Sequence, residues 1–300
     1  MVLARLYDSS HQGAAFEAVV VMRARGDVPG TTSRVVRDGS GRTGPAGPWL
    51  GVLAVGSPKS MRGQAYLTTS WDDGGQYDRR LAAILHRHGV RGTLYWPAHA
   101  ETWPLLGSSE TRELLDLGME IGAHSITHAD LTRLDDAALE REVAESRVQL
   151  EEHCGMPIRS FCYPSGRFDQ RARRAVAKAG YAVARTTRAF YDGGHFDPLL
   201  MPVTFQLYRH ERRAHASHAL RDRNGGGLWR WLTRYRFETD PVELARIALE
   251  HIRREGGVLH IWGHSWEIEQ QDMWGLLDAL LAGVSGHEDV RYVTNAQLAP

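Results

Sequence analysis

The sequence predicts an α/β fold in which mostly parallel strands close into a barrel. Short β-rich runs alternate with helical patterns after Met61, and this alternation is typical of parallel βαβ units. Seven or eight such units in about 240 residues favour a barrel over an open, doubly wound sheet. An apolar fraction of 42% and a charged fraction of 24% are ordinary for a chain with a large core.

Each predicted element follows from its local pattern. The expected strands are the apolar runs Ala65–Trp71, Thr93–Trp96, Met119–Ala123, Ile158–Tyr163, Tyr181–Ala184, Leu199–Phe205, Val258–Trp262 and Val290–Val293. The expected helices are Tyr77–His88, Glu110–Leu117, Asp135–His153, Asp169–Ala179, Pro241–Arg254 and Gln271–Leu281. The third helix has the clearest apolar face, and Gly89, Gly118, Gly155 and Gly180 stand where C-terminal caps are expected.

Residues 1–60 differ in composition from the rest of the chain. Glycine and proline are frequent between Gly26 and Gly56, which predicts a disordered extension. Met61 directly precedes the first patterned strand, so a start at Met61 and a flexible tail are both open interpretations. The predicted division is an extension over 1–60 and a barrel domain over 61–300.

A second unusual segment lies between Tyr208 and Arg236. It is rich in Arg and His and also contains a triple glycine and several aromatic residues. We expect a partly helical insertion between strands. It is either a solvated charged helix or a cap that contacts an anionic or sugar-like ligand through Arg and Trp.

Charge and cysteine content exclude several classes of protein. Lys+Arg and Asp+Glu both total 36, which argues against a basic surface for nucleic acid. No apolar run approaches the roughly 18–20 residues that span a bilayer. Cys154 and Cys162 cannot form a disulfide framework. Without a convincing signal segment, the sequence favours a cytoplasmic location and neither nucleic acid nor membrane as partner.

Two motifs at predicted strand ends indicate a metal site. Asp72 and Asp73 follow the first strand, and adjacent carboxylates there can divide their roles between base and metal ligand. His124 and His128 follow the third strand at a spacing that lets both rings reach one ion. Together with Asp73 they form a three-ligand set that leaves positions for water and substrate. Zinc is the default ion, and ligand type also allows cobalt, manganese, nickel or iron.

Two further blocks lie at the ends of later strands. The turn after Phe161 holds Tyr163, Ser165 and Arg167 as candidate oxyanion or substrate residues, since it can aim a backbone N–H at an oxyanion. In the seventh run, His260 and His264 fall on the same strand face. His260 is interpreted as a core residue and His264 as functional because it stands at the strand end.

These four blocks resemble the polysaccharide deacetylase family, also called the NodB-homology or carbohydrate esterase 4 family. The resemblance extends from about Gln64 to Val293. It implies a distorted (β/α)7 barrel, a divalent metal and hydrolysis of acetyl groups on a sugar, either a small molecule or an oligosaccharide. By the same resemblance Asp72 is the catalytic base, Asp73, His124 and His128 bind the metal, and His264 is the catalytic acid.

The chain departs from the family pattern in two blocks. The arginine that usually orients the base is replaced by Cys162, and Arg159, Arg167 and Arg185 are all open as substitutes. The family's Asp/Trp block, which tunes the acid histidine, has only weak counterparts in Asp192 and Asp197. In the seventh run, His260 stays open as an alternative to His264 for the catalytic acid.

The chemistry expected from these residues is metal-dependent hydrolysis of an N-acetyl amino sugar. Asp72 would accept the proton of the attacking water, and His264 would protonate the departing amine. Two alternatives stay open: a cyclic amide or imide hydrolase on the same fold, and a non-catalytic carbohydrate-binding protein.

Overall fold

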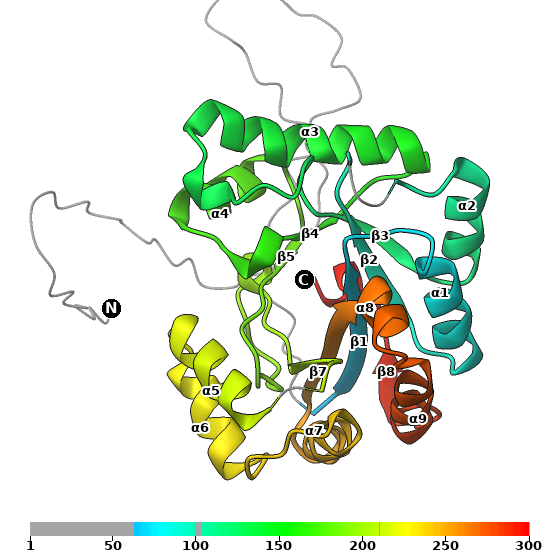
Figure 1. Cartoon of the computed structure of the whole chain (residues 1–300), viewed down its shortest axis with the longest axis vertical. Helices are drawn as coiled ribbons and strands as arrows, with labels where there is room; N and C mark the ends of the chain where they lie inside the picture. Colours follow the sequence, from blue (N-terminus) through cyan, green and yellow to red (C-terminus); the bar gives the residue numbers. More distant parts are fainter. Residues whose placement is uncertain (1–62, 100–103, 210, 300) are drawn as a thin grey trace, which may run out of the picture. The chain divides into compact units, whose positions relative to one another are not determined.

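Parallel strands form one curved sheet at the centre of the computed structural model, which describes residues 63–99, 104–209 and 211–299 (Figure 1). The predicted extension at 1–60 lies outside the described residues, and the domain division stays a prediction. The strands are β1 (Ala65–Asp72), β2 (Gly92–Trp96), β3 (Glu120–Ala123), β4 (Ser160–Cys162), β5 (Val183–Arg185), β6 (Phe205–Gln206), β7 (Gly257–His264) and β8 (Val290–Tyr292).

The strand order closes the sheet into a ring. The order is β5-β4-β3-β2-β1-β7-β6, and β8 pairs with the first part of β1. Met201, four residues before β6 begins, forms a parallel bridge with Arg185 of β5, so the segment that leads into β6 reaches the opposite edge of the sheet. Strands β1 to β7 therefore enclose a distorted (β/α) barrel, which confirms the predicted fold class.

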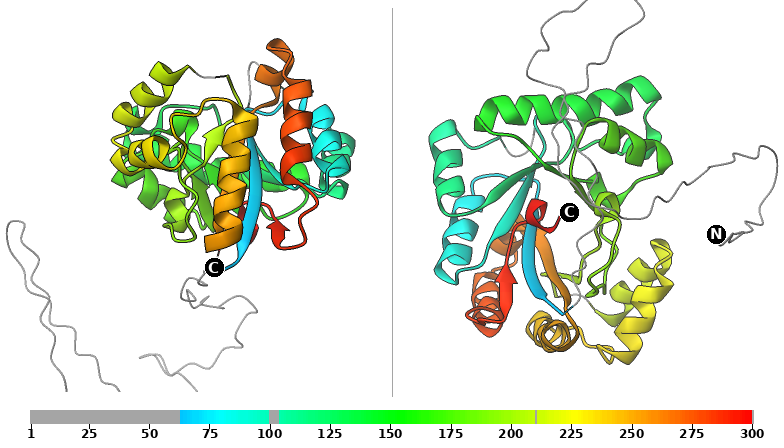
Figure 2. Two further views of the ribbon diagram at one scale, coloured as in Figure 1. Left: turned by 90° about the horizontal axis from the view of Figure 1, so that it is seen from below. Right: turned by 180° about the vertical axis from the view of Figure 1, so that it is seen from behind.

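Helices surround the strands on the outside (Figure 1, Figure 2). They are α1 (Asp78–Arg87), α2 (Ser108–Asp116), α3 (Asp136–Cys154), α4 (Gln170–Lys178), α5 (Arg212–Arg221), α6 (Gly225–Thr233), α7 (Pro241–Glu255), α8 (Ser265–Gln270) and α9 (Trp274–Val284). The longest helix, α3, is capped at both ends. The carboxylate of Asp135 accepts the Ala138 N–H at 2.8 Å before its first residue, and Gly155 follows its last residue in the left-handed conformation. No helix among the described residues is long and apolar enough to cross a membrane.

Two elements in the second half of the chain differ from the prediction. We expected a strand over Leu199–Phe205, but Asp197 and Pro198 start a short 3-10 turn there, and β6 begins only at Phe205. Helix α8 was not anticipated, because it starts directly after β7 without a loop to signal it. The insertion after Tyr208 forms α5 and α6, as its composition indicated.

The C-terminal segment fills the end of the barrel where the strands begin (Figure 2). Asn295 is fully buried, accepts from Thr68 at 2.8 Å and donates to the Tyr95 hydroxyl at 2.9 Å. The backbone N–H of Ala296 donates to Glu120 at 3.0 Å. The opposite end, where the strands finish, is therefore the end that can hold a pocket, as in other parallel α/β barrels.

Candidate active site

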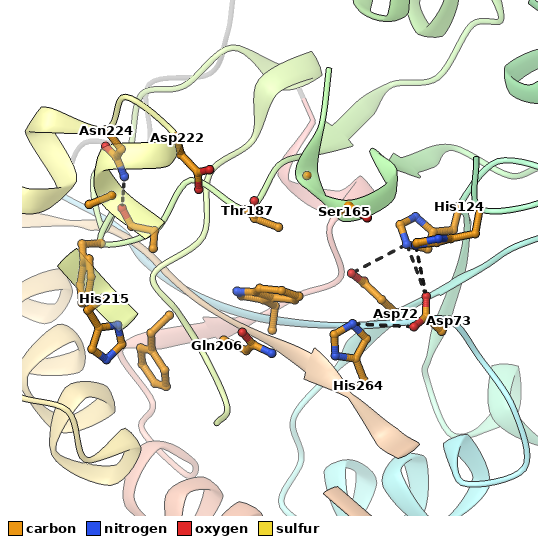
Figure 3. A pocket seen from close by; sticks show the side chains of 17 residues that line it. Asp72, Asp73, His124, Ser165, Thr187, Gln206, His215, Asp222, Asn224 and His264 are labelled. Atoms are coloured by element: carbon orange, nitrogen blue, oxygen red, sulfur yellow. Dashed lines mark hydrogen bonds and ion pairs between the residues drawn. The ribbon is translucent and has the colours of Figure 1, made fainter. Parts of the chain in front are cut away.

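Asp73 and His124 lie close together at the ends of β1 and β3 (Figure 3), and His128 adjoins both. The Nε2 atoms of His124 and His128 are 3.7 Å and 3.6 Å from Asp73 Oδ1. The two imidazole rings are edge to face, with centroids 4.7 Å apart. One carboxylate and two imidazoles, with their donor atoms within 4.8 Å of one another, fit a divalent transition metal.

The loop that carries the two histidines is held in an uncommon backbone conformation. Ser125 and His128 have φ values of 63° and 60°, and Asp73 across the site has 73°. Glu142 of α3 accepts hydrogen bonds from the backbone N–H groups of Ile126 and Thr127, which fixes the loop from outside. Non-glycine residues in this region cost about 1–3 kcal/mol each and concentrate at functional sites.

His124 is oriented for coordination by its second ring nitrogen. The ring is buried, and its Nδ1 donates to the backbone carbonyl of Cys162 at 2.8 Å. Burial lowers the pKa of His124, so the ring stays neutral at neutral pH. This tautomer leaves the Nε2 lone pair directed toward Asp73, the arrangement typical of a metal-ligating histidine.

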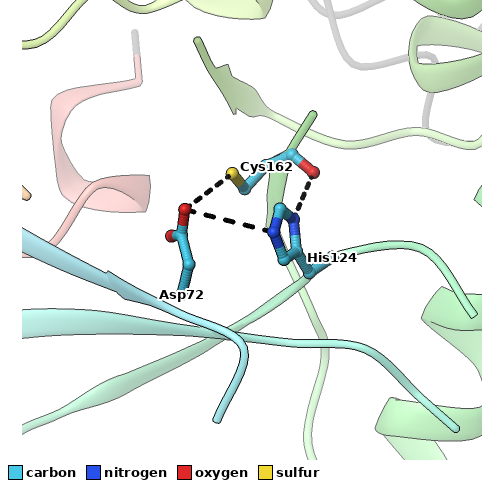
Figure 4. Close-up of side chains that lie close together, drawn as sticks. All are labelled: Asp72, His124 and Cys162. Carbon is cyan, nitrogen blue, oxygen red and sulfur yellow. Dashed lines mark hydrogen bonds and ion pairs between the residues drawn. The ribbon is translucent and has the colours of Figure 1, made fainter. Parts of the chain in front are cut away.

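A second group of potential ligands comprises Asp72, His124 and Cys162 (Figure 4). It is less suited to a metal, because Asp72 already forms an ion pair with Arg185. Burial also raises the pKa of the Cys162 thiol well above its usual value, so the thiol stays protonated. Thiolate is the form that binds metals. The first group is therefore the candidate metal site.

Asp72 is a buried carboxylate whose partner is Arg185. Asp72 is 4% exposed and Arg185 is 0% exposed. Burial alone would raise the pKa of Asp72, but the charges of Arg185, His124 and His264 outweigh it and lower the pKa. Asp72 is therefore ionised at neutral pH and able to accept a proton.

Arg185 is the one of the three candidate arginines that pairs with Asp72. It is the register partner of Cys162 on the neighbouring strand, and the Cys162 sulfur is 3.7 Å from the same carboxylate. The guanidinium lies over the Trp262 ring at 4.8 Å. Arg159 is exposed, and Arg167 pairs with Asp130 at 2.7 Å on the surface.

His264 completes the group from the end of β7. Its Nε2 is 3.8 Å from Asp73 Oδ2, and its Nδ1 contacts Glu267 at 2.5 Å. Burial alone would lower the pKa of His264, but Glu267, Asp72 and Asp73 together raise it above its usual value. A protonated His264 beside the pocket is suited to act as a general acid.

His260 lies below the site, inside the barrel. Its Nε2 contacts the Ser70 hydroxyl at 2.8 Å, and its Nδ1 contacts the Pro202 carbonyl at 3.1 Å. Burial lowers the pKa of His260 to about 3, so the ring is neutral. It does not line the pocket that holds His264. Geometry therefore supports the interpretation of His260 as a core residue.

A comparison with protein families finds one match to this part of the chain. Residues 59–184 match the sequence model of the family described as polysaccharide deacetylase. This segment is therefore similar to that family. The match includes Asp72, Asp73, His124 and His128. It ends one residue before Arg185 and does not reach His264.

The individual proteins that the chain resembles are distant from it in sequence. The uncharacterized protein YlxY of Bacillus subtilis (strain 168) is 26% identical over 121 residues, which are 40% of this chain and 35% of YlxY. YxkH of the same strain is 24% identical over 105 residues, which are 35% of this chain and 38% of YxkH. The chain thus spans little more than a third of the curated relatives it matches.

The chain also resembles solved structures of low sequence identity. A family 4 carbohydrate esterase from Streptomyces lividans in complex with acetate is 18% identical, with a TM-score of 0.47. The alignment covers 76% of this chain and 91% of that chain.

The structure brings only part of the third sequence block to the pocket. Ser165 lines the pocket and has a φ of 53°. The side chain of Tyr163 is instead buried and donates to the Leu199 carbonyl at 3.0 Å. Arg167 turns to the surface toward Asp130. Neither Tyr163 nor Arg167 therefore lines the pocket in which we expected them.

Two polar contacts beside the candidate metal site were not predicted from the sequence. Glu267 partners His264, whereas Asp192 pairs with Arg234 and Asp197 pairs with Arg173, both away from the site. Trp266 donates from its indole nitrogen to Asp73 Oδ2 at 3.1 Å. Glu267 follows His264 by three residues on the first turn of α8, so helical spacing could have signalled it.

Proposed function

We propose that this protein is a metal-dependent hydrolase that removes the N-acetyl group of an amino sugar. The proposal is carried by one observation: the buried carboxylate of Asp72, the potential metal ligands Asp73, His124 and His128, and the imidazole of His264 all line one pocket. The match of residues 59–184 to the polysaccharide deacetylase family supports the same chemistry.

Asp73, His124 and His128 would hold the ion, with zinc the first candidate. A divalent ion there would polarise the acyl carbonyl and make water more acidic. Asp72 does not have to serve as a ligand, because its carboxylate is held by Arg185. It accepts the proton of the attacking water while the pair with Arg185 keeps it in place.

His264 and Ser165 act on two different atoms of the tetrahedral intermediate, the leaving nitrogen and the oxyanion. His264 donates its proton to the leaving amine nitrogen, which is too basic to depart as an anion. Glu267 holds the opposite ring nitrogen, so Nε2 is the atom that faces the pocket. The backbone N–H of Ser165, in the turn after β4, is our candidate donor to the oxyanion.

The direct test is acetate release by the purified full chain with added zinc, cobalt or manganese. We expect turnover of N-acetylated amino sugars and none of cyclic imides. Turnover of a cyclic imide alone would assign the alternative hydrolase activity to this site. No bound ion and no turnover with any of the three metals would favour a carbohydrate-binding protein.

Replacing Asp73, His124 or His128 by Ala should abolish metal retention and activity together. Three ligands are the minimum for a tight catalytic site, and each variant leaves two. Metal content by elemental analysis and acetate release are the two measurements. His88→Ala is the matched control, since His88 pairs with Asp278 outside the site and should keep both properties. Full metal occupancy in any of the three variants would remove that residue from the ligand set.

Substitution of the two histidines of β7 should have different effects, one on catalysis and the other on stability. His264→Ala should lower kcat on an acetamide about 10²–10⁴-fold, and less on an activated ester, whose leaving group requires no proton. His260→Ala should keep kcat and instead reduce the free energy of unfolding by about 1–3 kcal/mol, because it leaves Ser70 without its buried partner. Steady-state kinetics and denaturant unfolding measure the two effects. An inactive but stable His260→Ala protein would move the acid role to His260.

A further inference from the structure

The α5–α6 insertion is fastened to the barrel next to the candidate active site. Asn224, at the start of α6, donates to the Ala189 carbonyl at 2.7 Å and also caps the helix by accepting from Gly227 at 2.9 Å. Trp231 stacks on Phe190 with ring centroids 5.8 Å apart. A hydrogen bond and a pair of stacked aromatic rings therefore hold the insertion against the barrel. We refer to the insertion as a wall of the pocket.

This wall forms the far side of the pocket that contains the metal site. The pocket has a volume of about 330 Å³. Asp72, Asp73 and His264 line one side, whereas Asn224 of the insertion lies on the other (Figure 3). Ala219 of the insertion also lines the pocket. A ligand with its acyl group at the metal site would therefore have its distal part against the insertion.

The surface between the two sides suits an uncharged ring with polar edges. Phe190, Phe205 and Trp262 provide apolar walls, and Thr187 and Gln206 add polar groups. No Lys or Arg is found among the described residues that line the pocket, whereas carboxylates stand at both sides of it. Recognition of a phosphate or carboxylate would use basic side chains. The aromatic walls and the lack of Lys and Arg among these residues favour an uncharged ligand.

Four Arg and Trp residues of the insertion contact other parts of the structure. Arg234 pairs with Asp192, and Arg230 donates to the Phe190 carbonyl. Trp229 is 66% exposed and Trp231 belongs to the core. None of these four lines the pocket. They therefore do not support the cap interpretation, in which Arg and Trp contact an anionic or sugar-like ligand.

We infer that the insertion is a specificity wall that restricts the substrate to a small, uncharged N-acetyl amino sugar of one or two rings. The volume lies at the lower end of the roughly 300–1,000 Å³ of small-ligand pockets. A polymer would require a longer groove, whereas residues of α5 line this small pocket opposite the metal ligands. The inference rests on the proposed function, because it places the acetamide at the metal site.

Two neighbouring residues of α5 provide a matched pair of variants. Ala219 is 7% exposed and lines the pocket, whereas Leu220 is 70% exposed and does not. Ala219→Trp fills the distal part of the pocket, and Leu220→Trp places the same side chain on the outer surface. Circular dichroism and thermal unfolding of both variants verify that they fold.

The experiment uses the zinc-loaded full chain with four substrates: N-acetylglucosamine, its 1-phosphate, its β-1,4-linked tetramer and 4-nitrophenyl acetate. We expect kcat/KM for N-acetylglucosamine to exceed that for the phosphate and the tetramer by about tenfold or more. Ala219→Trp should raise KM for N-acetylglucosamine about tenfold or more and raise KM for the small ester by a smaller factor. Leu220→Trp should match the wild type on every substrate. Calorimetric titration with N-acetylglucosamine should show the same loss of affinity in Ala219→Trp alone.

The possible failures are distinguishable. A preference that rises with chain length, a preference for the phosphate, or equal behaviour of the two tryptophan variants would overturn the specificity wall while deacetylation stands. Binding of N-acetylglucosamine that Ala219→Trp weakens, without hydrolysis of any substrate, would support the wall and refute the proposed deacetylation. No binding and no hydrolysis would overturn both.

Discussion

Replacing Asp72 by Asn is expected to lower kcat for deacetylation about 10²–10⁴-fold and to leave the bound metal in place. The amide has nearly the same shape as the carboxylate and can still accept from Arg185 through its oxygen. It cannot accept the proton of the attacking water. Because Asp73, His124 and His128 are unchanged, metal content by elemental analysis should equal that of the wild type.

A second buried carboxylate gives a control for this variant. Asp78 is fully buried, accepts from Trp96 and Ser265 and lies outside the pocket. Burial raises its pKa to about 7. Asp78→Asn should change the free energy of unfolding and retain most of the turnover. Near-normal rates in Asp72→Asn would mean that another group accepts the proton, and metal loss in that variant would make Asp72 a ligand.

The sequence was most informative about residues that stand at the ends of strands. Asp73, His124 and His264 lie immediately after or at the end of apolar runs, and the carboxyl ends of parallel strands meet at one face of a barrel. Their convergence could therefore be predicted from local patterns alone. The same reasoning separated His264 from His260, because only the former stands where β7 opens to the pocket.

Arg185 illustrates what local patterns do not reveal. Its choice over Arg159 and Arg167 depends on the register between β4 and β5, which pairs it with Cys162. No short-range signal specifies that register, since both strands are only three residues long. The pocket wall depends likewise on a contact between Phe190 and Trp231, 41 positions apart in the chain, whose partners are each ordinary core aromatics.

Removing the guanidinium in Arg185→Leu is expected to damage both stability and catalysis. Breaking a buried ion pair by removing one partner costs about 3–5 kcal/mol, since it leaves Asp72 buried with an unpaired charge. Without Arg185 the pKa of Asp72 rises, because burial favours the protonated form and the largest opposing charge is gone. The acidic limb of the kcat/KM profile should therefore move to higher pH. Denaturant unfolding and a pH-rate profile measure the two effects.

Matched variants distinguish positioning of Asp72 from general stability. Arg159→Leu and Arg167→Leu remove the other two arginines and should leave the acidic limb unchanged, since neither contacts Asp72. Arg185→Lys keeps a charge but lacks the planar fork that holds a carboxylate, so it serves where the Leu variant does not fold. Adding Cys162→Arg to Arg185→Leu returns a guanidinium from the adjacent strand, in register with the lost one and on the side where the Cys162 sulfur is already 3.7 Å from Asp72. Recovery of the wild-type pH profile in that double variant would show that Asp72 requires a guanidinium, whichever strand supplies it. An unchanged profile in both Arg185→Leu and Arg185→Lys would mean that Arg185 only fills the barrel interior.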